Sequence, residues 1–107
     1  MSGVSRRRMY NRRMLDLAAN QIETQIRAMA RNYTSLDYCT GFERNHSAHY
    51  EDFVRDYMRR GKDRPHAIQI VHSQLMHTVN DRFHQLTRKV QTIPNPKGGD
   101  MSAWERF

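Results

Sequence analysis

Apolar side chains recur at steps of three and four residues along two long stretches of the chain, 9–33 and 64–93. No glycine or proline interrupts the first stretch. This spacing places the apolar side chains on one face of an α-helix, and we therefore predict an amphipathic helix over residues 9–33. Its apolar positions are Leu15, Ala18, Ile22, Ile26, Met29 and Tyr33.

The second stretch has the strongest helical pattern in the chain. Pro65 is tolerated in the first turn of a helix, whereas Pro94 and Pro96 end one, so we predict a helix over residues 64–93. Its apolar side chains alternate steps of three and four, like the a and d positions of a coiled coil. This seam is long for the core of one small chain, so we predict a homodimer. The predicted seam residues are Met76, Val79, Phe83, Leu86 and Val90.

A shorter helix is predicted between the two long ones. It begins near Ser47, a residue type that caps helices, and it ends at Gly61. Residues 34–45 contain Gly41 and several small polar residues, so we predict a connection there. Strand-like alternation of useful length is absent, and the predicted fold is all-α: a small antiparallel helical bundle of two long helices and one shorter helix.

The two ends of the chain are predicted to lie outside this bundle. Residues 1–8 are predicted to be a disordered basic arm. Residues 94–107 hold two prolines and two glycines and are predicted to be a flexible tail, whose Trp104 and Phe107 could dock on the bundle or on a partner. The helical domain is therefore predicted to span residues 9–93.

Length and composition are those of one small domain. The chain has 107 residues, of which 37% are hydrophobic, so a single core would be thin. No stretch approaches the roughly 20 apolar residues of a membrane-spanning helix. The single cysteine, Cys39, excludes an internal disulfide framework and favours the cytoplasm or another reducing compartment. An arginine-rich start leaves the mitochondrial matrix open.

Positive charge is unevenly distributed along the chain. The formal net charge is +7, and residues 1–33 hold seven arginines against Asp16 and Glu23. Residues 64–93 hold four bases against Asp81. Arginine is favoured where a planar group must bind phosphate or carboxylate. A genomic bias toward arginine codons would explain the same counts.

The outward face of each long helix is a candidate nucleic-acid surface. On the first helix, basic and amide side chains lie opposite Ile22 with no acid in the line, a pattern that suits phosphates and ribose hydroxyls. A line of polar side chains on the predicted helix over residues 64–93 has the same mixture of hydrogen-bond donors. An ordinary solvent-exposed helix face would have a similar composition. The predicted nucleic-acid-binding residues are Arg6, Arg7, Arg8, Arg12, Arg13, Asn20, Thr24, Arg27, Arg31, His77, His84 and Arg88.

Motifs for metal binding or catalysis are weak. Potential metal ligands are dense only at Cys39, Glu43, His46 and His49. Their Glu-x-x-His pair occurs once, whereas di-iron bundles use it twice, and the cysteine–histidine spacing is not that of a zinc finger. Glycine-rich phosphate loops, nucleophile elbows and His-Glu-x-x-His motifs are absent. We therefore predict no metal, no cofactor and no enzymatic activity.

These observations favour a non-enzymatic nucleic-acid-binding protein. Two rigid helices of about 37–45 Å could span consecutive grooves of a duplex. We expect such a protein to coat or sequester RNA duplex by shape and phosphate contacts, without sequence specificity. RNA is preferred to DNA because the last helix is too long for a usual recognition helix. The alternative is a small helical interaction protein, such as a phage or viral inhibitor or an assembly subunit, that binds an acidic protein partner.

Overall fold

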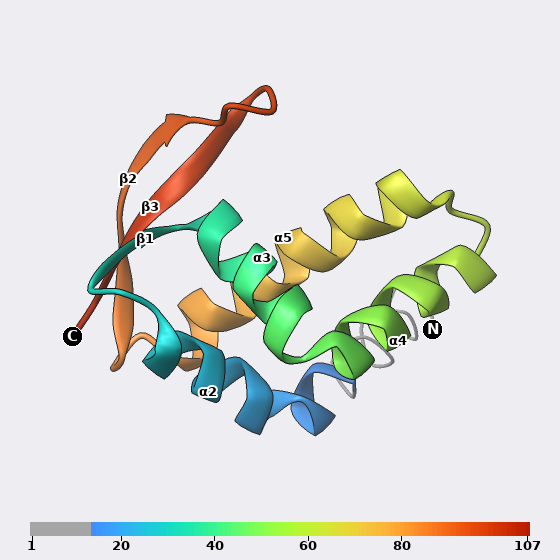
Figure 1. Ribbon diagram of the computed structural model, residues 1–107, viewed down its shortest axis with the longest axis horizontal. Helices are drawn as coiled ribbons and strands as arrows, with labels where there is room; N and C mark the ends of the chain where they lie inside the picture. The colour runs from blue at the N-terminus through green and yellow to red at the C-terminus, as the bar shows by residue number, and fades with distance from the viewer. Residues whose placement is uncertain (1–13) are drawn as a thin grey trace, which may run out of the picture.

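The computed structural model of the chain describes residues 14–107. Its helices lie on one side of a small antiparallel sheet, and β2 and β3 form a hairpin that projects beyond the helices (Figure 1). The strand order is β1-β3-β2. Residues 14–17 are also helical. In chain order the elements are α2 (Ala19–Ala28), β1 (Asn32–Thr34), α3 (Ser35–Asn45), α4 (Ser47–Arg59), α5 (Arg64–Arg82), β2 (Thr87–Pro94) and β3 (Asp100–Arg106).

The all-α prediction is wrong, and the main reason is that the predicted helix over residues 64–93 is two elements. The start is as predicted: Pro65 lies in the first turn of α5, and the Asp63 carboxylate accepts a hydrogen bond of 2.9 Å from the His66 backbone N–H. The helix ends at Arg82, and residues 87–94 form β2. That segment contains four β-branched residues, which favour a strand. Over so short a run, steps of three and four do not distinguish a helix from a strand.

The predicted helix over residues 9–33 also ends early. α2 stops at Ala28, and Met29 is extended, with φ −75° and ψ 153°. Tyr33 then lies in β1, where it pairs with Trp104 of β3. The apolar position at Tyr33 therefore belongs to the sheet rather than to the helical stripe.

Residues 34–45 were predicted to be a connection, and this prediction is wrong because they form α3. Thr34 and Asp37 make a reciprocal cap, in which each side chain accepts a hydrogen bond of 3.0 Å from the other residue's backbone N–H. Gly41 lies within the helix and faces Gln25 of α2, whose amide nitrogen occupies the place of a Cβ. The glycine therefore marks close helix packing and not a break.

The predicted shorter helix is confirmed. α4 runs from Ser47 to Arg59, and Gly61 follows with φ 93°, a conformation that L side chains rarely adopt. α4 and α5 are joined by this turn and pack against each other. The disordered arm predicted over residues 1–8 lies outside the described residues.

The flexible tail predicted over residues 94–107 is corrected by β3. Its prolines and glycines lie around a hairpin turn, where Gly98 and Gly99 take φ values of 109° and 71°. Strand β3 pairs with both other strands, so it is the centre of the sheet. Trp104 is 3% exposed, stacks with Tyr33 and donates a hydrogen bond of 3.0 Å to the Ser35 hydroxyl.

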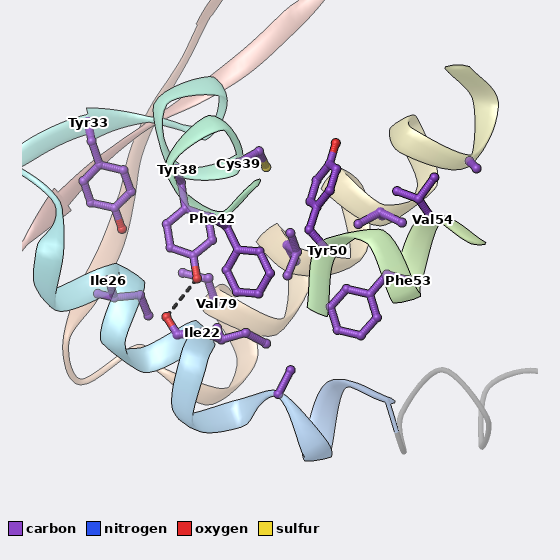
Figure 2. Close-up of a cluster of buried hydrophobic side chains, with 14 of the residues drawn as sticks. Ile22, Ile26, Tyr33, Tyr38, Cys39, Phe42, Tyr50, Phe53, Val54 and Val79 are labelled. Carbon is purple, nitrogen blue, oxygen red and sulfur yellow. Dashed lines mark hydrogen bonds between the residues drawn. The ribbon is translucent and has the colours of Figure 1, made fainter. Parts of the chain in front are cut away.

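One hydrophobic core joins the helices and the base of the sheet (Figure 2). Large aromatic side chains fill its centre, and the Tyr38 hydroxyl donates a hydrogen bond of 2.9 Å to the Ile22 carbonyl. Burial of so many aromatic rings supplies the apolar area that a small domain needs. Fully buried side chains of the core include Ile22, Ile26, Tyr38, Phe42, Tyr50, Val54, Val71, Leu75 and Val79.

The predicted dimer seam is not a continuous stripe, because its residues lie on different elements. Val79 is fully buried in the chain's own core. Met76, Phe83 and Leu86 are partly buried against that same core. Val90 is 55% exposed on β2. The homodimer prediction has therefore lost the seam on which it rested.

Candidate functional site

The predicted nucleic-acid residues of the basic arm and of the first helix are only partly within the described chain. Arg6, Arg7, Arg8, Arg12 and Arg13 lie outside it.

Asn20, Thr24 and Arg27 are exposed on α2 as predicted. The Thr24 hydroxyl donates a hydrogen bond of 2.7 Å to the Asn20 carbonyl, and Arg27 forms an ion pair of 3.0 Å with Glu23. This helix face is thus partly neutralised by its own acid.

Arg31 and Arg88 were predicted on two separate helices, and the sheet brings them to one carboxylate. Glu105 lies on the central strand, in register with Asn32 of β1 and Arg88 of β2. Its side-chain oxygens lie 3.0 Å from Arg88 Nη2 and 3.9 Å from Arg31 Nε. The two arginine side chains stay 77% and 64% exposed, whereas Glu105 is 24% exposed. This pair of guanidinium groups exceeds the single carboxylate by one charge.

The predicted line of His77, His84 and Arg88 does not exist, because these residues lie on three different segments. His77 is on α5, His84 is in the turn after it, and Arg88 is on β2. A ring nitrogen of His84 lies 3.3 Å from the Asp81 carbonyl. The structure therefore separates the three side chains that a continuous helix would have aligned.

A groove of about 430 Å³ lies between α3, α5 and the β2–β3 hairpin. Apolar side chains line part of it, including Leu36 of α3 and Met76 of α5, and Met101 of β3 faces it from the hairpin. Small-molecule sites have volumes of about 300–1,000 Å³ and combine apolar walls with a few polar groups. The polar side chains that line this groove include Ser73, His77, Asn80, Lys89, Asn95, Asp100 and Ser102.

His72 borders the groove from its inner side. Its Nε2 atom is 2.9 Å from the Tyr50 hydroxyl. Burial, together with the positive charge of Lys97 in the hairpin turn, lowers the pKa of His72. Burial raises the pKa of Tyr50 to about 12, so the tyrosine keeps its proton and shares this hydrogen bond with the imidazole, whose tautomer decides which group donates. The pair is thus a satisfied structural contact at neutral pH, as the position of His72 on the apolar side of α5 requires.

Chemistry at the cysteine is disfavoured. Burial raises the pKa of the Cys39 thiol to about 12, so the thiol carries its proton at neutral pH and is a poor nucleophile. Within residues 14–107, no group of three or more histidine, cysteine, aspartate or glutamate side chains is placed to hold a metal ion. The groove thus combines a protonated thiol at Cys39 with the polar and apolar side chains named above.

The sequence analysis missed the groove because one of its walls is the hairpin. Lys89 and Asn95 were read as part of a helix and a tail, although a turn containing two glycines between two short strands is a hairpin signal. Ser73 and Asn80 belong to the polar line predicted on the outward face of the helix over residues 64–93, and without the hairpin nothing lay opposite them.

Comparison of the chain with protein families, with curated protein sequences and with solved structures finds no match. None of the helices within residues 14–107 is long and apolar enough to cross a membrane.

Proposed function

We propose that this protein binds nucleic acid through phosphate contacts and does not catalyse a reaction on it. The separation of charge along the chain is the observation that carries the proposal. Residues 1–13 hold five of the 18 basic residues and none of the 11 acids. The described residues hold the other 13 bases and all 11 acids, a net charge of only +2. Basic segments beside a nearly neutral fold are typical of nucleic-acid-binding arms.

Ion pairing within the fold strengthens this argument. Seven arginines of the described chain each contact an acid within 4.0 Å, so much of their charge is balanced internally. The five arginines of residues 1–13 have no acid in their own segment. Within the fold, the side chains of Arg31 and Arg88 are exposed and share one carboxylate, that of Glu105. They therefore leave a net positive charge of one on the outer face of the sheet.

The preference for RNA duplex loses its structural argument. It assumed two helices of about 37–45 Å, whereas α2 and α5 have 10 and 19 residues and span about 15 and 28 Å at 1.5 Å per residue. The binding test therefore includes duplex RNA, duplex DNA and single strands, with no preference expected among them. An acidic protein partner is the competing proposal.

Salt dependence of binding tests the proposal. Affinity of the full chain for fluorescein-labelled duplex RNA, duplex DNA and single-stranded RNA would be measured by anisotropy between about 50 and 200 mM salt. Each phosphate contact contributes about 0.9 to the slope of log affinity against log salt on duplex DNA. Replacing Arg6, Arg7 and Arg8 together by Gln is expected to reduce that slope by about 2.7.

The matched control removes three charges from the fold instead. Arg44, Arg55 and Arg59 are exposed on α3 and α4, and their replacement by Gln is expected to change the slope by less than about 1. Equal losses in the two triple variants would contradict a role for residues 1–13. Affinity of the wild type weaker than about 10⁻⁴ M for all three nucleic acids would favour the acidic protein partner.

A further inference from the structure

The groove between α3, α5 and the hairpin holds polar side chains that no internal contact uses. Within residues 14–107, the Lys89 ammonium, the His77 ring and the Asn80 amide make no hydrogen bond or ion pair, yet all three line the groove. His77 and Asn80 are three residues apart on α5, so they lie on the same helix face. Lys89 is on the opposite wall, where β2 pairs with Trp104. Three side chains that can donate hydrogen bonds therefore line the same groove from two elements.

This donor set suits an anion with several oxygens. An ammonium group, an amide and an imidazole can each donate to a phosphate oxygen, and a charged donor strengthens such a bond. Among the described residues, Asp100 is the one acid that lines the groove, and it pairs with Pro94 near the hairpin turn. It lies four residues along β3 from the partner of Lys89, about 13 Å at 3.3 Å per residue. Asp100 is thus distant along the sheet from Lys89.

The groove also has an apolar lining. Leu36, Met76, Met101 and Trp104 belong to it. Methionine sulfur makes favourable contacts with aromatic rings and adapts to their shape. A volume of about 430 Å³ is in the range of small-ligand sites.

We propose that this groove binds a nucleotide, with the phosphate at Lys89, His77 and Asn80 and the base against Met76 and Met101. The proposal deepens the proposed function and rests on it for the choice of a nucleotide over other aromatic anions. A free nucleoside monophosphate and an unpaired nucleotide within a strand both present a phosphate and a base, so both fit this proposal.

The single tryptophan provides the measurement. Trp104 is the only Trp of the chain and lines the groove, so its fluorescence reports on a ligand bound there. The full chain would be titrated with adenosine and uridine monophosphates, with the two nucleosides, with inorganic phosphate, and with a short single-stranded RNA. We expect a saturable change with the monophosphates and a weaker response to nucleosides and to phosphate alone.

Two exposed basic residues give a matched pair of variants. Lys89 lines the groove, whereas Arg59, at the end of α4, is not among the residues that line it. Lys89→Gln is expected to weaken monophosphate binding about tenfold, the effect of one charged hydrogen bond, and to leave nucleoside binding unchanged. Arg59→Gln is expected to leave both unchanged. Equal effects of the two substitutions, or no saturable signal with any nucleotide or RNA, would overturn the proposal.

Two further comparisons distinguish a free nucleotide from a strand as the ligand, and the groove proposal from the proposed function. Tighter binding of the RNA than of the monophosphates would identify the strand as the source, and the reverse order would identify a free nucleotide. The variant lacking Arg6, Arg7 and Arg8 keeps the groove, so its fluorescence response to monophosphates is expected to persist. If the wild type gives no saturable fluorescence response to monophosphates, but replacement of these arginines still reduces the salt slope, the groove proposal is refuted and the proposed function is not.

Discussion

The helical part of the molecule and the β2–β3 hairpin are held by different kinds of contact. The helices meet over aromatic and aliphatic side chains that are fully buried, among them Tyr38, Phe42 and Leu75. Along β2 and β3 only Thr87 and Trp104 are buried, and both lie at the base of the hairpin. The outer half of the hairpin is therefore held by backbone pairing. We therefore expect the helical core to contribute more to stability than the outer half of the hairpin.

Polar contacts tie the base of the hairpin to β1 and to α3. The Thr87 hydroxyl donates to the Glu105 carbonyl at 2.8 Å and accepts from the Tyr33 hydroxyl at 2.6 Å. Trp104 donates to the hydroxyl of Ser35, the first residue of α3, and that hydroxyl donates to the Ser102 carbonyl at 3.3 Å. Each such bond contributes about 1 kcal/mol, so these contacts anchor the hairpin from its base as far as Ser102.

Truncation of one apolar side chain in each region should give the largest contrast. Phe42→Ala removes a fully buried ring from the helical core and is expected to lower the free energy of unfolding by about 3–5 kcal/mol. Ile93→Ala, at a half-buried position on β2, is expected to cost less than about 1 kcal/mol. Urea unfolding measures both. Similar losses would show that the hairpin carries as much of the stability as the core.

Two glycines give the next contrast. Gly41 of α3 has Gln25 where a Cβ would lie, and Gln25 also bonds Asn45 at 2.9 Å, so Gly41→Ala is expected to cost about 1–3 kcal/mol by overpacking. Gly98 in the hairpin turn has open space around it but φ 109°, so Gly98→Ala costs about 1–3 kcal/mol through backbone strain alone.

The double variant with Gln25→Ala separates these two causes. Removing the Gln25 side chain makes room for a methyl group on α3, so the additional cost of Gly41→Ala is expected to fall or change sign in that background. The cost of Gly98→Ala is expected to be the same in both backgrounds. Urea unfolding of the six proteins gives the comparison, and an unchanged cost for Gly41→Ala would refute close packing at this helix crossing.

Local signals in the sequence predicted the helical region better than the sheet. Gly61 and Pro65 act through neighbouring residues, and they correctly bounded α4 and α5. The sheet depends on pairs such as Asn32 with Glu105, which are more than 70 residues apart and leave no local trace. Phe83 continued an apolar spacing but ends the helix, because the chain beyond it has a partner strand.

The same distinction applies to the candidate site. Arg31 and Arg88 were selected for their charge, and both are exposed as that argument required. Their common partner Glu105 could not be inferred, because it was assigned to a tail. Lys89 and Asn80 were not selected as a pair, since only the folded hairpin places one opposite the other. The exposed charged residues could thus be predicted from the sequence. Which side chains from distant segments lie together in the fold could not be predicted.

The smallest expected effect is a pH dependence at His72, where the helical core meets the groove. Burial and then the charge of Lys97 lower the pKa of His72, so the unfolded chain binds a proton more readily than the folded chain. The free energy of unfolding is therefore highest above about pH 6.5 and falls as the pH drops toward the lowered pKa. His46, whose pKa is lowered by burial and by His49, acts in the same direction.

A substitution isolates the contribution of His72 to this pH dependence. His72→Gln removes the titrating group and keeps a hydrogen-bonding partner for the Tyr50 hydroxyl, so the loss of stability between about pH 8 and pH 5 is expected to shrink without vanishing, because His46 remains. Urea unfolding of wild type and variant at the two pH values measures the difference. An equal loss in both proteins would show that the His72 imidazole is as easily protonated in the fold as in the unfolded chain. That result would indicate that water reaches His72 from the hairpin turn. The boundary between the water-excluding helical core and the solvent-exposed hairpin would then lie at α5.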